Sequence, residues 1–482
     1  MSGLSLRSAH PTVLAVLDAH DADPGDGAPS EFLSREQCKA LFERVVAMTT
    51  GGGHTNAYFE SKYSGTATWA RNRVYLSASV KGLILELFRG INGAYGAART
   101  TRVDQDGLNQ AVRRAESALI WNSESAEQMR ETKLDEPILS PTLWSANTYA
   151  CDGAARGSLA QRLIRPAEEA GVWSAGELLI AGRGYAVLGT NIVSRYYPVT
   201  AVECSMTVRN PKGTGSGWAG MTHYDIARVD PAALAAVALD KCLRSANPSA
   251  LEPGRYTAIL EPQAVSDLLA PLLGRNAVPM DRGHAEFGFG PFAYKPGQSK
   301  IGQRILDPRI SLRSDPMDPE AGFIPFERTE GAPYQAVSWV ADGYLRDLWY
   351  RRDYALAMLN KPQPLFLQGS YRLSSNVAPV SMDDMIRSTR RGIVVTRFSN
   401  VMLVDEASML CTGFTRDGLW LVENGAITKP IKNFRFTESP LFVLNKVDAI
   451  GAPVRVFDQD YARVVPPIKV NDFSFTSLAD AV

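Results

Sequence analysis

The sequence predicts an α+β protein with two main domains: an N-terminal mixed antiparallel sheet packed with helices, and a C-terminal β-rich domain of barrel-like form. A chain of 482 residues is longer than a single hydrophobic core usually supports. Short β-like runs follow one another closely between Asn56 and Arg102, as in an antiparallel meander. A turn-rich stretch, Asn247–Gly254, precedes a half that is largely β. We therefore expect a leader at 1–34, an N-terminal domain at 35–248 and a C-terminal domain at 249–482.

The elements of the N-terminal domain follow from caps and hydrophobic spacing. Ser34 is typical of an N-cap, and the helix after it has apolar residues at helical spacing until the glycines 51–53 end it. The β-like runs are Asn56–Tyr63, Gly65–Arg71, Arg73–Ala78, Leu83–Arg89 and Tyr95–Arg102. A further helix is predicted with Asp104 or Asp106 as its N-cap. Helices are also predicted over Ser158–Ala170 and from Pro231 to Ser245, with strands at Glu177–Leu188, Val193–Val208 and Gly217–Val229.

In the C-terminal domain, Tyr256–Leu260 predicts a strand, and Gln263–Leu273 predicts a helix that Pro262 opens. Residues 275–334 are rich in Gly, Pro and Asp and indicate ordered loops with short strands. The remainder is expected to be largely β, apart from short helices near Met382–Arg390 and Ser439–Ile450.

Composition excludes several classes of partner. Lys+Arg and Asp+Glu both number 51, whereas a duplex-binding protein usually has a basic excess, so nucleic acid is not an expected partner. Nothing approaches 18 consecutive apolar residues, so no membrane-spanning helix is expected. No apolar segment follows a positive one at the N-terminus, so no signal peptide is indicated. The five cysteines are scattered and form no CxxC pair, which favours a cytoplasmic location.

The most specific pattern stands near the C-terminus. Thr412–Gly418 leads into a Leu-Val-Glu-Asn-Gly run at 421–425, where Asn-Gly alone predicts only a tight hairpin. The motifs that follow are Lys429–Phe436, Val447–Gly451 and Pro467–Phe473, and upstream stand Arg309–Leu312 and Glu330–Pro333. In order and spacing this constellation resembles the TldD/PmbA (TldE) metallopeptidase family, and the resemblance covers roughly residues 35–477.

The resemblance implies a zinc helix that this chain lacks. TldD-type members carry an HExxxH helix straight after a β-strand, where two histidines hold zinc and the glutamate takes a proton from the metal-bound water. The matching helix here is 262–273, and its polar groups include only Ser266 and Asp267 as candidates. The histidines form no such pair; they are His10, His20, His54, His223 and His284. We therefore expect no metal site in this chain and expect zinc in a partner subunit.

Candidate site residues fall into two groups. Ser266 and Asp267 are candidate catalytic groups, and the family geometry implies Glu330 and Arg313 nearby, although no histidine stands at a spacing that makes it a base for Ser266. The second group is aromatic and basic: Trp339, Tyr344, Trp349 and Arg351. These four residues are either core with a solvated rim or the wall of a peptide-accepting groove, because Tyr, Trp and Arg favour recognition surfaces. Cys411 is interpreted as a buried thiol rather than a nucleophile.

Two functions remain open. The resemblance implies a non-catalytic TldE/PmbA-like subunit, a pseudo-peptidase that pairs with a zinc-bearing TldD-type chain in a heterodimer. That complex would cleave unfolded or extended peptides, which it would hold by strand-like pairing. The alternative is an amide-processing, tailoring enzyme of peptide-derived antibiotic biosynthesis that uses non-zinc residues. The family also has an old label as a modulator of DNA gyrase, but zero net charge argues against direct DNA contact.

Overall fold

The computed structural model describes residues 32–121, 138, 141–274 and 277–479. Most of the expected leader, together with His10 and His20, lies outside the described residues. The described chain divides into two compact units. The first comprises the described residues within 1–64, 79–133 and 181–198, and the second those within 65–78, 134–180 and 199–482.

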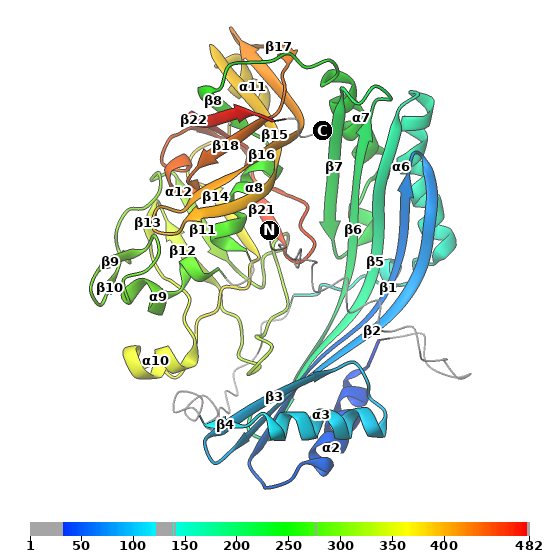
Figure 1. Cartoon of the computed structure of the whole chain (residues 1–482), viewed down its shortest axis with the longest axis vertical. Coiled ribbons are helices and arrows are strands. Elements are labelled where there is room, and N and C mark those ends of the chain that lie inside the picture. The colour runs from blue at the N-terminus through cyan, green and yellow to red at the C-terminus, as the bar shows by residue number, and fades with distance from the viewer. Residues whose placement is uncertain (1–31, 122–137, 139–140, 275–276, 480–482) are drawn as a thin grey trace, which may run out of the picture. The chain divides into compact units, whose positions relative to one another are not determined.

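A seven-stranded sheet contains the strands of the N-terminal half, in the order β4-β3-β2-β1-β5-β6-β7 (Figure 1). Its strands are β1 (His54–Ala70), β2 (Arg73–Ile91), β3 (Ala94–Thr100), β4 (Ile120–Trp121), β5 (Trp173–Gly189), β6 (Arg195–Arg209) and β7 (Ser216–His223). Pairs β2–β3, β3–β4 and β6–β7 are antiparallel. The predicted meander of strands is confirmed.

In the first unit, two helices bury their apolar faces together with strand residues. These helices are α2 (Arg35–Met48) and α3 (Gln105–Ser117). Phe42 and Val45 of α2, Leu108 and Val112 of α3, and Leu85 of β2 belong to one buried cluster. The predicted N-caps are confirmed: the Ser34 side chain accepts from the Gln37 backbone in a capping box, and the Asp104 side chain accepts from Gly107.

The strands are longer than the sequence predicts. The runs predicted as separate at 56–63 and 65–71 form one continuous strand, β1, and those at 73–78 and 83–89 form another, β2, so Gly65 and Gly82 both lie inside strands. At Gly65 the reason is packing, because a Cβ there would lie 2.2 Å from the Arg156 guanidinium. Glycine in a strand interior often marks such a close approach. No such neighbour explains Gly82, where a Cβ would meet nothing within 4 Å.

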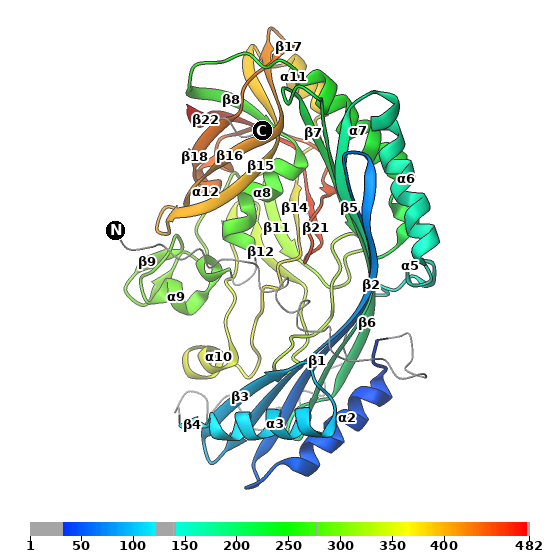
Figure 2. The same ribbon diagram turned by 45° about the vertical axis from the view of Figure 1, so that its right-hand side comes forward.

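Helices cover one face of the sheet in the second unit (Figure 2). These are α6 (Gly153–Glu169) and α7 (Pro231–Arg244), preceded in the chain by the short α5 (Ala146–Tyr149). Leu163 of α6 and Ala238 of α7 pack in one buried cluster with Val202 and Met206 of β6. The strand predicted over Gly217–Val229 ends at His223, after which Ile226–Arg228 form a 3-10 turn.

The C-terminal half contains a closed five-stranded ring in the order β15-β8-β22-β18-β16, which β16 closes by pairing with β15. Its strands are β8 (Gly254–Leu260), β15 (Arg391–Asp405), β16 (Leu410–Glu423), β18 (Phe434–Glu438) and β22 (Ile468–Leu478), with β17 (Ala426–Pro430) and β19 (Val447–Ile450) attached. β8 and β15 run parallel. The expected barrel-like domain is confirmed, and so is the Asn424-Gly425 hairpin, whose φ angles are 51° and 82°.

A six-stranded sheet packs into the same hydrophobic core as the ring. Its order is β13 (Tyr344–Leu345), β12 (Val337–Ala341), β11 (Ile310–Ser314), β14 (Tyr371–Ser375), β21 (Arg463–Val465) and β20 (Val454–Arg455). The remaining elements are α8 (Pro262–Leu273), α9 (Arg282–Glu286), α10 (Arg352–Leu359), α11 (Met382–Arg387), α12 (Pro440–Val443), β9 (Ala293–Lys295) and β10 (Gln298–Ser299). The helix expected over Ser439–Ile450 was wrong in part: it stops at Val443, and its last residues form β19.

Candidate functional site

The candidate site is built around α8, the helix predicted to follow a strand in the C-terminal domain. β8 ends at Leu260, and α8 begins at Pro262, so both elements are confirmed. The helix contacts β15 of the ring and β21 of the six-stranded sheet. Most of its side chains are buried, among them Ala264, Val265, Leu268, Leu269, Leu272 and Leu273. A helix that is apolar on nearly all sides is a core helix.

Asp267 satisfies the backbone of β15 where β8 is too short to do so. β8 pairs with β15 from Gly392 to Val395, and the Glu261 N–H still reaches the Val395 carbonyl at 2.9 Å. Beyond that point, Asp267 Oδ2 accepts the Phe398 N–H at 2.9 Å. Asp267 therefore replaces a neighbouring strand at the edge of β15, because a buried backbone donor needs an acceptor.

The other oxygen of Asp267 is also used. Asp267 Oδ1 accepts from Gln263 Nε2 at 2.9 Å. Burial raises the pKa of Asp267 to about 6, although the Arg397 guanidinium and these two hydrogen bonds oppose the rise. Gln263 in turn exchanges two hydrogen bonds with the Phe457 backbone, at 3.2 and 3.1 Å. Asp267 is thus fixed in a packed structural role.

Ser266 is buried at 1% exposure and faces Tyr371 of β14. Burial raises the pKa of Tyr371, whereas the Arg463 guanidinium and the Ser266 hydroxyl act in the opposite direction. In the described part of the chain, no histidine is hydrogen-bonded to Ser266. A nucleophilic serine needs an adjacent base, and the arrangement around Ser266 lacks one.

Strands β14 and β21 carry polar side chains on both faces. Tyr371 lies opposite Arg463, and Arg372 lies opposite Val464. Because neighbouring positions on a strand point to opposite faces, Tyr371 and Arg463 share the face toward α8, while Arg372 points to the other face. On the α8 face, Arg463 forms an ion pair with Asp458 at 3.0 Å, and burial raises the pKa of Asp458.

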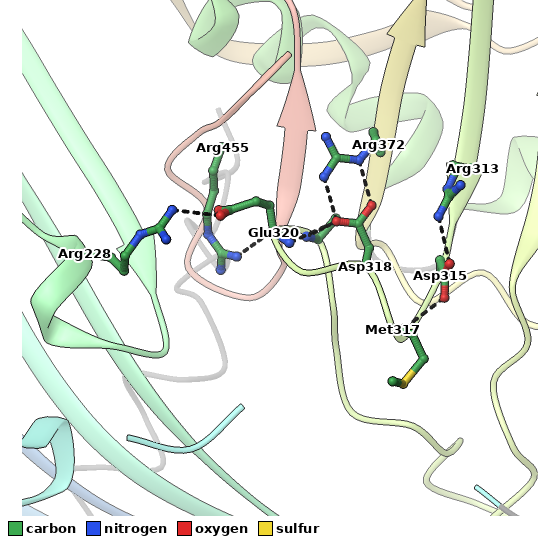
Figure 3. Close-up of polar contacts among 9 residues, drawn as sticks. Arg228, Arg313, Asp315, Met317, Asp318, Glu320, Arg372 and Arg455 are labelled. Atoms are coloured by element: carbon green, nitrogen blue, oxygen red, sulfur yellow. Dashed lines mark hydrogen bonds and ion pairs between the residues drawn. The ribbon is translucent and has the colours of Figure 1, made fainter. Parts of the chain in front are cut away.

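On the other face, a loop of acidic residues is fixed by arginines (Figure 3). Asp318 accepts two hydrogen bonds from Arg372, at 2.7 and 2.6 Å. Burial alone would raise the pKa of Asp318, but these bonds and two backbone N–H groups hold it at about 2. Arg228 reaches Glu320 at 2.8 Å, and Arg455 donates to the Glu320 carbonyl and, at 2.6 Å, to the Thr222 carbonyl.

Glu330 and Arg313 belong to other clusters. Glu330 forms an ion pair with Arg352 at 2.6 Å, and burial raises the Glu330 pKa. Arg313, half exposed, pairs with Asp315 at 2.8 Å. Among the described residues, neither Glu330 nor Arg313 forms a hydrogen bond or ion pair with Ser266 or Asp267. The structure therefore does not bring the four candidate residues together as one site.

The aromatic and basic group is spread over different environments. Trp339 is fully buried and donates to Ser314 Oγ at 2.9 Å. Trp349 is partly buried and donates to the Ala277 carbonyl at 2.8 Å. Tyr344 is 42% exposed, and the exposed Arg351 pairs with Asp353 at 3.2 Å. Trp339 is therefore a core residue, whereas Tyr344 and Arg351 are open to solvent.

The residues at α8 do not fit a zinc ion. Zinc requires several histidine, cysteine or carboxylate ligands within about 2.0–2.3 Å, but both Asp267 oxygens already accept protein hydrogen bonds. Within the described ranges, no three His, Cys, Asp or Glu side chains gather as ligands would. His284 forms a hydrogen bond with Glu406 at 2.9 Å. Burial raises the pKa of the Cys411 thiol to about 11, which disfavours the thiolate form that binds metals.

A cavity near Asp417 is a feature that the sequence analysis missed. Asp417 and Gly418 form a bulge in β16 opposite Thr396, with φ angles of 58° and 127°. Asp417 is buried, accepts the Ser216 hydroxyl at 2.5 Å and lies 3.6 Å from Arg397. It lines a cavity of about 310 Å³ together with Ser245 and Lys432. The sequence does carry a signal for this bulge, because Asp417-Gly418 stand inside a strand pattern, where such a pair indicates a bulge.

Comparison with known proteins gives the same assignment for the C-terminal half. Residues 253–477 match the family model of the PmbA/TldA metallopeptidase C-terminal domain. No curated protein sequence matches the chain.

Three solved structures share the fold. A putative modulator of a DNA gyrase from Thermotoga maritima is 14% identical, with a TM-score of 0.77 over 91% of this chain and 100% of that one. A putative modulator of DNA gyrase from Bacteroides thetaiotaomicron is 18% identical, with a TM-score of 0.75 over 92% and 100%. TldE from Thermococcus kodakarensis is 13% identical, with a TM-score of 0.72 over 91% and 99%. At these identities the likeness shows the fold alone. Among the described residues, no helix has the length and apolarity needed to cross a bilayer.

Proposed function

Residues 253–477 match the C-terminal domain of the PmbA/TldA metallopeptidase family, and on that premise we propose that this chain is a non-catalytic, TldE-like subunit. Its partner in the proposed heterodimer is a zinc-bearing TldD-type chain, and the complex acts on unfolded or extended peptides. In this pairing the partner supplies the metal and the water that attacks the amide. The present chain supplies scaffold and surface.

The state of α8 carries the proposal. This helix follows β8 where the family resemblance places the zinc helix, and its apolar residues are part of the main C-terminal core. Its one carboxylate, Asp267, holds the Phe398 N–H and the Gln263 amide. A catalytic carboxylate must instead reach substrate or a metal-bound water. Removal of Asp267 from this role would leave a buried backbone donor without an acceptor.

The experiment is a comparison of peptide cleavage by three samples: this chain, a TldD-type partner encoded beside it, and their mixture. The substrates are an unfolded protein and an extended peptide without fixed sequence. We expect a complex on size-exclusion chromatography and cleavage that requires the partner's HExxxH motif. Cleavage by this chain alone, or failure of the two chains to associate, would refute the proposal.

The alternative is an amide-processing enzyme of peptide-derived antibiotic biosynthesis that uses Ser266 and Asp267. One observation favours it: a buried carboxyl with a pKa of about 6 lies in the range that acid–base catalysis uses. The variants Ser266→Ala and Asp267→Asn separate the two functions. Loss of a tailoring activity in either variant, with the fold and the complex intact, would favour the enzyme; full activity in both would remove it.

A further inference from the structure

The outer half of β15 has a strand edge that nothing described pairs with. β8 covers one edge of β15 only from Gly392 to Val395. From Ser399 to Asp405, β15 pairs with β16 on its other side, and the described chain places no third strand beside it. We call the unpaired side of residues 399–405 the outer edge. An open edge is a row of unpaired N–H and C=O groups that another strand can bind.

The outer edge is also unusually apolar. Met402 is 64% exposed, Leu403 41% and Val404 58%. Three consecutive exposed apolar residues cover both faces of the strand, since successive side chains alternate. Natural proteins usually protect such edges with lysine, proline or a covering element.

A second segment, near the end of β15, also carries exposed apolar side chains. Glu406, which follows β15, bonds to His284 of α9 at 2.9 Å. The His284 ring stacks on Phe289, with centroids 5.3 Å apart. Phe289 is 59% exposed and Phe287 is 79% exposed. Figure 2 shows the tip of the β15–β16 hairpin close to the β9 segment. We call the exposed side chains of Phe287, Phe289, Met402, Leu403 and Val404 together the apolar surface; exposed apolar groups of this kind mark sites of association.

We propose that the outer edge and the apolar surface bind a strand of the partner subunit, edge to edge; this rests on the proposed function. A row of open N–H and C=O groups along a strand is the arrangement that the edge of another strand pairs with. A partner of the same fold carries the corresponding strand and can therefore offer such an edge. Asp405 and Glu406 make the tip of the hairpin acidic, so the partner strand has alternating apolar residues and a Lys or Arg opposite the tip.

Hydrogen exchange on the assembled complex tests the pairing. Strand addition gives the outer-edge amides new hydrogen bonds, so we expect slower exchange within 399–405 when the partner is added. The first residues of β2, Arg73–Val80, are another exposed stretch of strand and serve as internal control, with unchanged exchange. Protection at β2 but not at 399–405 would overturn the proposal.

A matched pair of variants tests the energetics. Met402→Lys places a charge on the apolar surface, whereas Met358→Lys changes a methionine of equal exposure, 63% against 64%, on α10. We expect the dissociation constant of the heterodimer to rise about tenfold or more for Met402→Lys and to change less than about twofold for Met358→Lys. Val404→Lys repeats the test at a second position.

The other outcomes are distinguishable. A wild-type complex that forms normally but ignores Met402→Lys and Val404→Lys would overturn this proposal and leave the proposed function standing. Failure of the wild-type chains to associate would overturn both. Self-association of this chain with the same protection would make a second copy the occupant. Protection by an extended peptide alone would make the outer edge a substrate site. Each of the last two results would overturn the partner assignment.

Discussion

The two halves of β15 have different environments within one strand. In the inner half, Gly392–Val395 lies between β8 and β16, and Asp267 binds the Phe398 N–H just beyond the end of β8. Ile393 and Val395 are fully buried. In the outer half, Ser399–Asp405 has one neighbouring strand, and Met402 and Val404 are exposed. The same element thus changes from core to open surface within a few residues.

The difference shows how the end of a strand edge is satisfied in one half of β15 and left open in the other. A strand edge inside a protein must be satisfied by another strand or by a side chain. At the inner half, α8 follows β8 in the chain and supplies a carboxylate for that purpose. At the outer half no such acceptor is described, and the edge stays available to another chain.

The largest expected effect is at the inner half. Asp267→Ala leaves the Phe398 N–H and the Gln263 amide without their acceptor and removes the negative charge near Arg397. We expect the free energy of unfolding to fall by about 2–4 kcal/mol, measured by urea denaturation. Asp267→Asn keeps an acceptor oxygen, so its free energy of unfolding should fall by less than that of Asp267→Ala. Equal stability of the alanine variant and the wild type would contradict a structural role for Asp267.

The pH dependence of stability sharpens the same point. Burial raises the pKa of Asp267 from 3.8 to about 6, so between pH 4 and 6 the folded chain holds a proton that the unfolded chain has lost. Its stabilising contribution is full below pH 4 and is lost as the pH rises through 6. As the pH rises from 4 to 6, the free energy of unfolding of the wild type should fall by about 2–3 kcal/mol relative to that of Asp267→Asn. Parallel urea-denaturation profiles for the two proteins would contradict the raised pKa.

A smaller effect is expected at Gly392, where β15 passes β8. A Cβ there would lie 2.7 Å from the Thr257 carbonyl oxygen and 2.7 Å from the Thr389 methyl group. Gly392→Ala should therefore cost about 1–2 kcal/mol through displacement of the paired strands. The shift of the thermal unfolding midpoint measures it. A neutral result would mean that the inner half is packed more loosely than its burial indicates.

The smallest effect belongs to the outer half of the free chain. Met402→Ala and Val404→Ala remove exposed side chains, so each should change the free energy of unfolding by less than about 0.5 kcal/mol. The same urea titration serves as the measurement. A loss comparable to that of Gly392→Ala would show that the outer half is already covered in the isolated chain and would remove the contrast.

The sequence could predict the elements with strong local signals. Ser34 and Asp104 cap helices as expected, since their side chains satisfy free N–H groups at the helix starts. Asn424-Gly425 makes the expected turn because both residues tolerate positive φ. Strand lengths could not be predicted at Gly65, because the guanidinium of Arg156 that requires a glycine there is 91 positions away in the sequence.

The candidate site was predictable only in part, for a similar reason. The helix 262–273 and the absence of zinc ligands on it can be found in the sequence alone. The Phe398 N–H that Asp267 binds lies 131 positions away in the sequence, and Arg463, whose charge also acts on Asp267, lies farther still. Hydrophobic spacing does not determine which distant strand end needs an acceptor. The open edge of β15 was equally hidden, since it depends on where β8 stops pairing.

Zinc content of the purified chain is the most direct test of the central claim, that the α8 position has exchanged metal chemistry for a structural role. The chain is expressed alone with added zinc, freed of loosely held metal by gel filtration and measured by elemental analysis, with a TldD-type chain treated in parallel. We expect stoichiometric zinc in the TldD-type chain and substoichiometric zinc in this one. One tightly held zinc ion per molecule of this chain would contradict the claim.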